Sequence, residues 1–113
     1  MTDTKCQPVF CDLTVFGDND KRRQRAVLTE MRARLKAAAE LEDGYLFTLP
    51  PEPYMLHLLA ELIELEGKCC PFLAFTLEVK DGGHSITLRV GGPEGTKELL
   101  RAELHLDGEP AAK

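Results

Sequence analysis

Apolar residues recur along the chain with two different periods, and each period predicts one kind of secondary structure. Residues 7–16 alternate in the way of a strand with one strongly apolar face. From about residue 20 to 42 the apolar side chains return every three or four positions, so we expect an amphipathic helix there. Gly44 is suited to end that helix in a left-handed conformation, and a short strand is expected at 45–49.

The second half of the chain repeats the change from helix to strand. Residues 53–66 have the apolar spacing of a helix, and two runs with strand alternation follow at 72–80 and 84–90. The Asp81-Gly82-Gly83 sequence between these runs is typical of a hairpin turn. A last helix is expected at about 96–106.

The predicted element order is βαβαββα, which belongs to the α+β class. This order is compatible with a two-layer sandwich, in which the helices pack on one face of a four-stranded mixed sheet. With 113 residues, of which 43% are hydrophobic, the chain is expected to form a single domain, 1–113, around one core. The two ends, 1–7 and 107–113, are expected to be flexible.

The charge and composition of the chain argue against some classes of binding partner. The formal net charge is −5, which argues against nucleic acid because binding phosphates requires a basic surface. The one basic stretch, within 21–36, is expected to be a solvated helix face. The sequence shows neither a long apolar run nor a secretory leader, so we expect a cytoplasmic protein that does not enter a membrane. No organic cofactor is expected, and a homodimer is compatible with the sequence.

Two adjacent cysteines, Cys69 and Cys70, carry the strongest chemical signal. They precede Pro71 and follow Gly67, which we expect to stop or kink the second helix, so the pair should lie at an irregular helix-to-strand junction. Neighbouring side chains of a regular strand point to opposite faces, whereas such a junction lets both sulfurs turn toward one point. In a reducing compartment, cysteines are more often metal ligands or redox groups than structural disulfides.

A third thiolate is expected from Cys11, if its strand lies beside the strand that follows the pair. Three thiolates favour soft ions such as mercury, arsenic or copper in trigonal or linear coordination. A tetrahedral zinc site needs a fourth ligand, for which Cys6, Glu66 or a water molecule are candidates. The sequence therefore predicts a soft-metal site of Cys11, Cys69 and Cys70, whose partner is a metal ion or a small thiol-reactive ligand.

Other functions stay open for the same residues. Cys69 or Cys70 could be the nucleophile of a thiol-dependent lyase or reductase, with Glu66 or Asp12 as a proton carrier, although Asp12 is better explained as a surface charge. The chain could instead be an interaction domain in which the cysteines are incidental. A vicinal pair can also close into a strained eight-membered disulfide, which would make it a redox group.

The residues around the cysteine pair resemble a family of small bacterial proteins that carry a Cys-Cys-Pro-Phe motif. The similar strings are EGKCCPFLAF at 66–75, LRVGGPEG at 88–95, DGY at 43–45 and CDL at 11–13. The resemblance covers about residues 9–104. Such proteins accompany heavy-metal resistance genes, so the resemblance implies a role in metal resistance or handling and groups Cys11, Cys69 and Cys70 as one set. It carries over no enzymatic activity and does not identify the ion.

Overall fold

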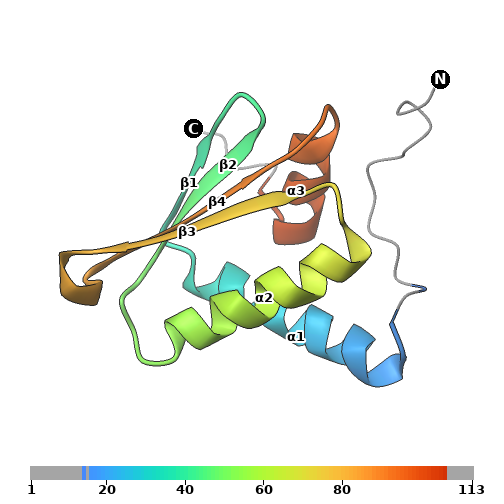
Figure 1. Cartoon of the computed structure of the whole chain (residues 1–113), viewed down its shortest axis with the longest axis horizontal. Helices are drawn as coiled ribbons and strands as arrows, with labels where there is room; N and C mark the ends of the chain where they lie inside the picture. Colours follow the sequence, from blue (N-terminus) through green and yellow to red (C-terminus); the bar gives the residue numbers. More distant parts are fainter. Residues whose placement is uncertain (1–13, 15, 107–113) are drawn as a thin grey trace.

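A computed structural model describes residues 14 and 16–106 of the chain (Figure 1). Within that part the elements follow the order α, β, β, α, β, β, α. The helices and strands are α1 (Asp18–Arg34), β1 (Ala37–Glu40), β2 (Gly44–Leu49), α2 (Met55–Cys69), β3 (Ala74–Lys80), β4 (Ser85–Gly91) and α3 (Thr96–Leu104). A short 3-10 turn, Asp81–Gly83, joins β3 to β4 at the predicted hairpin position. The α+β class is confirmed.

The four strands form one sheet in the order β1-β2-β4-β3, and every neighbouring pair is antiparallel. The prediction of a mixed sheet is therefore wrong. The sheet is built from two antiparallel hairpins, and the α2 connection carries the chain from the β1–β2 hairpin to the opposite edge of the sheet. Figure 1 shows α1 and α2 side by side below the sheet, with α3 at one end, an arrangement compatible with a two-layer sandwich.

The predicted helix at 20–42 is correct only in its first part. Helix α1 ends at Arg34, and residues 37–40 form the edge strand β1. The Ala37-Ala38-Ala39 run favours helix by propensity. Backbone pairing with β2 overrides this preference, because Lys36 N–H donates to Thr48 O at 2.9 Å and the register continues to Glu40 opposite Tyr45.

The role expected of Gly44 is also different in the structure. Gly44 is the first residue of β2 and lies opposite Gly91 of β4. A Cβ atom built at Gly44 would lie 1.8 Å from the backbone oxygen of Val90, so glycine is required by this close strand-to-strand approach. It does not cap the first helix.

Only two residues of the predicted first strand, 7–16, are described. Thr14 lies in a 3-10 turn and Phe16 in a bend, so neither belongs to a strand. Phe16 nevertheless packs into the core, with 6% of its surface exposed. The other positions of the predicted strand, including Cys11 and Asp12, lie outside the described residues, as does Cys6.

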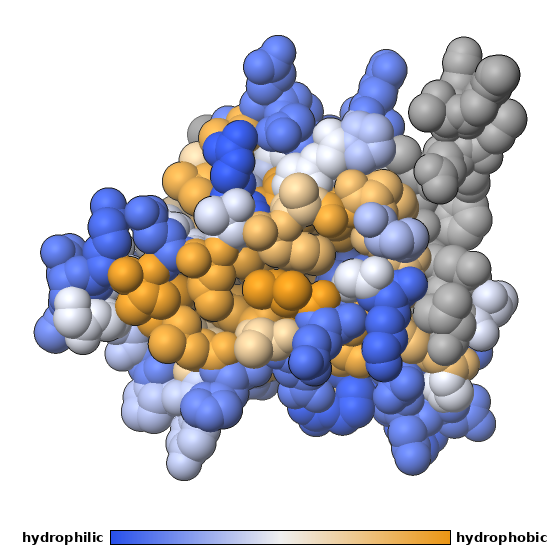
Figure 2. All heavy atoms as spheres, viewed as in Figure 1, coloured by the Kyte–Doolittle hydropathy of each residue, from blue (hydrophilic) through white to orange (hydrophobic). Residues whose placement is uncertain are grey.

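The core lies between the inner face of the sheet and the helices. The inward positions of β2 and β4 alternate with outward ones, and they meet the apolar sides of α1 and α2. The edge strand β3 extends beyond this cover, so that Leu77 and Val79 are 37% and 43% exposed. Figure 2 shows apolar residues gathered on the face that carries β3. Among the described residues, no helix combines the length and the apolar character needed to cross a membrane.

The basic side chains of α1 behave as expected for a solvated helix face. Arg23 forms an ion pair with Glu61 of α2, and Arg34 pairs with Glu30 and with Glu52. These arginines are about half exposed, so solvent screens each pair and the pairs add little to stability. The Arg23–Glu61 pair links α1 to α2, and the Arg34–Glu52 pair links α1 to the segment before α2.

Candidate metal-binding site

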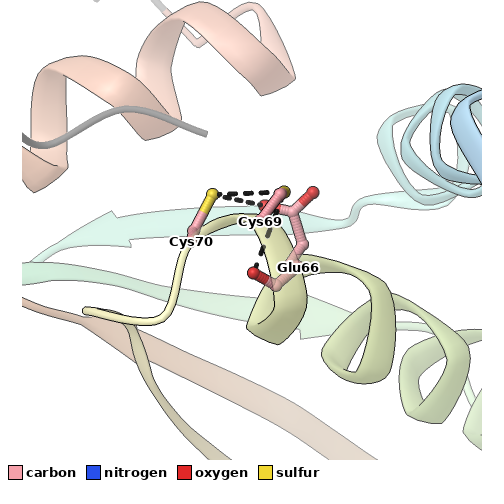
Figure 3. Close-up of side chains that lie close together, drawn as sticks. All are labelled: Glu66, Cys69 and Cys70. Atoms are coloured by element: carbon pink, nitrogen blue, oxygen red, sulfur yellow. Dashed lines mark hydrogen bonds between the residues drawn. The ribbon is translucent and has the colours of Figure 1, made fainter. Parts of the chain in front are cut away.

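The end of α2 brings Glu66, Cys69 and Cys70 together (Figure 3). Glu66 and Cys69 are three positions apart on the helix and therefore share one face. Cys70 has left the helix, with φ −130° and ψ 68°, while its N–H still donates to Glu66 O at 2.7 Å. This break lets the Cys70 side chain turn back toward the other two. The junction predicted for the pair is confirmed, but Gly67 neither stops nor kinks the helix, which continues to Cys69.

The candidate ligand atoms of these three residues lie close to one another. The Cys69 and Cys70 Sγ atoms are 3.5 Å apart, and Cys70 Sγ is 3.7 Å from Glu66 Oε1. One ligand atom from each residue falls within 4.8 Å of the other two. Cys69 and Cys70 are 0% exposed and Glu66 is 3% exposed. The arrangement could hold a metal ion, and it is sealed from solvent.

Side chains from the other two helices complete the cluster. Gln24 of α1 is buried, and its Nε2 donates to Glu66 Oε2 at 2.7 Å and lies 3.9 Å from Cys69 Sγ. Glu103 of α3 forms a hydrogen bond with Glu66. Sequence reasoning missed both residues. The sequence does contain a signal for Gln24. It is a polar residue at a position where the helical period calls for a buried apolar one, because it precedes Val27 and Met31 on the inner face of α1.

Burial governs the ionisation of the two carboxyl groups. Burial, the charge of Glu66 and the hydrogen bond to Glu66 together raise the pKa of Glu103 to about 8. Burial also raises the pKa of Glu66, whereas the hydrogen bonds from Gln24 and Glu103 oppose that change. The hydrogen bond between the two groups raises the pKa of Glu103 and lowers that of Glu66, so Glu103 keeps the proton and donates to the Glu66 carboxylate. The cluster thus holds a carboxylate that can bind a cation.

The oxidation state of Cys70 sets a condition on metal binding. Cys70 is disulfide-bonded in this structure. Its partner is not Cys69, because a disulfide bond is about 2.05 Å long and the two sulfurs lie 3.5 Å apart. The vicinal disulfide considered from the sequence is therefore wrong. Cys70 must be reduced before it can serve as a thiolate ligand.

The structure brings together two of the three predicted metal ligands. Cys69 and Cys70 converge as predicted, and Glu66, a candidate zinc ligand, joins them. Cys11, predicted as the third thiolate, lies outside the described residues, so its part stays a prediction. The same holds for Cys6.

The chain was compared with known proteins at the level of families, curated sequences and solved structures. No family model matches it, no curated protein matches it, and no solved structure matches it. The resemblance to the Cys-Cys-Pro-Phe family stays a prediction. The site must therefore be interpreted from its own geometry.

Proposed function

We propose that the reduced protein binds a thiophilic metal ion through Cys69, Cys70 and Glu66, and that it serves in metal handling or resistance. The observation that carries the proposal is the convergence of two sulfurs and one carboxylate on one buried point. Thiolates are the preferred protein ligands of soft and borderline ions such as Cu(I) and Zn(II). The family resemblance supports a role in metal resistance or handling.

Electrostatics also supports a cation at this point. Two thiolates and the Glu66 carboxylate would place three negative charges in a region that excludes water, which is costly without a counter-charge. A divalent ion supplies that counter-charge, and its binding displaces the thiol protons. Without a metal ion, the reduced cysteines are expected to remain protonated.

Burial argues against the nucleophile hypothesis. An attacking sulfur must meet its substrate, and reactive cysteines are typically partly exposed. Cys69 and Cys70 are both 0% exposed. A single ion fits such a site much better than an organic substrate does.

Competition with a chromophoric chelator tests the proposal. Protein treated with a phosphine reductant is expected to take up one ion per chain. The Cys69→Ser/Cys70→Ser double variant is expected to lose at least tenfold in affinity, because it lacks both thiolates. Parent and double variant with equal affinity and stoichiometry would contradict the proposed function. Circular dichroism of the variant checks that a lower affinity does not arise from unfolding.

A further inference from the structure

Strand β3 has a neighbour on only one side among residues 14 and 16–106. It is the last strand of the sheet, and it pairs with β4 in continuous register from Ala74 to Lys80. An unpaired strand edge is a template for a further strand. We propose that β3 pairs antiparallel with β3 of a second copy of this chain, so that the two sheets join across a two-fold axis at Leu77. This inference is independent of the proposed metal site.

The edge of β3 lacks most of the features that keep an edge strand from pairing. Such features include proline, a β-bulge and a very short strand. β3 is seven residues long, contains no proline and pairs with β4 without a bulge. The other edge strand, β1, is only four residues long and ends at Glu40, which forms an ion pair with Lys97. Of the two edges, β3 is therefore the one suited to pairing.

The apolar surface beside this edge extends from β3 onto α2. Leu77 and Val79 of β3 are exposed, and so is Leu56 of α2. Glu61 marks the side of α2 that faces α1, because it pairs with Arg23. Leu56 lies five positions earlier, at about 100° per residue, so it is on the side of α2 away from α1. Figure 2 shows a band of apolar residues across β3 and the adjacent side of α2, which is typical of an interaction site.

A two-fold axis at Leu77 brings apolar residues of the two copies together. Leu77 then lies opposite Leu77 of the second copy, and Phe75 lies opposite Val79. Each of these three residues already lies beside a buried apolar residue of β4 on the same face of the sheet. The β4 neighbours of Phe75, Leu77 and Val79 are, in that order, Val90, Leu88 and Ile86. The joined sheet would therefore have three rows that are apolar from β4 of one copy to β4 of the other, and such cross-strand pairs stabilise a sheet.

The polar face of β3 is self-complementary in the same register. Glu78 lies opposite the uncharged Thr76 of the second copy, and Lys80 lies opposite Ala74, so like charges do not face each other directly. Arg89 of β4 pairs with Thr76 and therefore shares a row with Glu78 of the second copy. An axis at Glu78 would instead place two carboxylates opposite each other, which is unfavourable. The charges thus favour the register that also joins the apolar rows.

The mass of the protein in solution is the first test. Light scattering of the parent under reducing conditions is expected to give twice the mass of one chain. Leu77→Lys is expected to weaken the dimer at least about tenfold, because it places two ammonium groups opposite each other. Ala38→Lys is the control, because Ala38 is exposed on the other edge strand, and it should dimerise like the parent. Circular dichroism checks that both variants are folded.

Cysteine cross-linking tests the register, and it does not depend on the lysine variant folding. Only the residue on the axis faces its own counterpart, so Leu77→Cys is expected to form a disulfide-linked dimer in oxidised glutathione. Val79→Cys is the control, because it faces Phe75 of the second copy. Its own counterpart would be four positions further along the strand, about 13 Å away. The parent measures the cross-linking that arises from the native cysteines.

Three results would overturn the proposal. A parent that stays monomeric would leave another segment of the same chain, such as residues 1–13, or an unrelated partner as the occupant of this edge. A dimer that Ala38→Lys disrupts and Leu77→Lys does not would place the interface at β1. Cross-linking of Leu77→Cys that is no faster than that of Val79→Cys would contradict the register centred on Leu77. A dimeric parent with rapid cross-linking of Leu77→Cys alone would support the joined sheet.

Discussion

Gln24 Nε2 donates a hydrogen bond to Glu66 Oε2 at 2.7 Å, and this contact joins α1 to the end of α2 across 42 positions of the sequence. Both side chains are buried. A buried carboxylate that loses a donor bears the cost of its desolvation without compensation. Gln24 therefore does more than fill the space between the helices, because it holds Glu66 in place.

Removal of this donor is expected to destabilise the fold. Gln24→Ala should lower the free energy of unfolding by about 1–3 kcal/mol, because it removes a hydrogen bond from a buried carboxylate and creates a cavity. Urea denaturation measures the change. Arg25→Ala, at an exposed position of the same helix, is the control and should stay within about 0.5 kcal/mol of the parent. Equal effects of the two substitutions would show that the contact does not matter.

The raised pKa of Glu103 predicts a pH dependence of stability. Its pKa rises from 4.5 in the unfolded chain to about 8 in the folded protein, so the folded state binds the proton more tightly. This contribution to stability is complete below about pH 4.5 and is lost as the pH rises toward about 8. Glu103→Gln keeps a neutral donor at every pH. The variant should therefore lose less stability than the parent over this range.

Urea denaturation of both proteins at about pH 5 and about pH 9 measures the difference. At the higher pH, Glu103→Gln should be the more stable protein, because the parent then buries a second negative charge beside Glu66. A parent and a variant with the same slope of stability against pH would show that Glu103 ionises as an ordinary carboxyl group.

The disulfide at Cys70 predicts that reduction controls metal uptake. A disulfide sulfur is not a thiolate, so the form described here should bind Zn(II) much more weakly than reduced protein does. Equilibrium dialysis with and without a phosphine reductant measures the two affinities. Thiol titration before and after reduction should show a gain of thiols that accompanies the gain of binding. Uptake that is equally tight in both forms would place the ion elsewhere.

Two glycines should respond in opposite ways to alanine. Gly44→Ala is expected to destabilise the protein by about 1–3 kcal/mol, because its Cβ would collide with the backbone oxygen of Val90 at 1.8 Å. Gly67→Ala is expected to stabilise it by about 0.5–1 kcal/mol, because Gly67 is inside α2 and no atom lies within 4 Å of its added Cβ. Thermal unfolding of the two variants checks the sign of each effect. Destabilisation by Gly67→Ala would show that the end of α2 depends on a flexible backbone.

The period of the apolar residues was sufficient to predict those helices and strands in which the apolar residues are the buried ones. Helix α2 and the β3–β4 hairpin fall close to the predicted ranges, because their apolar residues follow one period and a turn sequence separates the strands. Strand β1 was not predictable in this way. Its residues, Ala37–Glu40, are all exposed and favour a helix, and only the pairing with β2 makes them a strand.

The candidate site was predictable only where its residues are neighbours in sequence. Cys69 and Cys70 are adjacent, and Glu66 precedes them by one helical turn, so the chain itself shows that they can meet. Gln24 and Glu103 reach the cluster from α1 and α3, and their participation depends on how three helices pack. The approach of the two sulfurs depends on where α2 ends, and the expected stop at Gly67 would have placed the cysteines differently.

X-ray absorption at the zinc edge of reduced, zinc-loaded protein tests the central claim most directly. The account predicts one tightly held zinc per chain, with sulfur neighbours at about 2.3 Å and an oxygen neighbour at about 2.0–2.2 Å. The sulfur contribution should disappear in Cys69→Ser/Cys70→Ser. A first shell of nitrogen and oxygen alone in the parent, or no retained zinc, would contradict the claim that Cys69, Cys70 and Glu66 form a metal site.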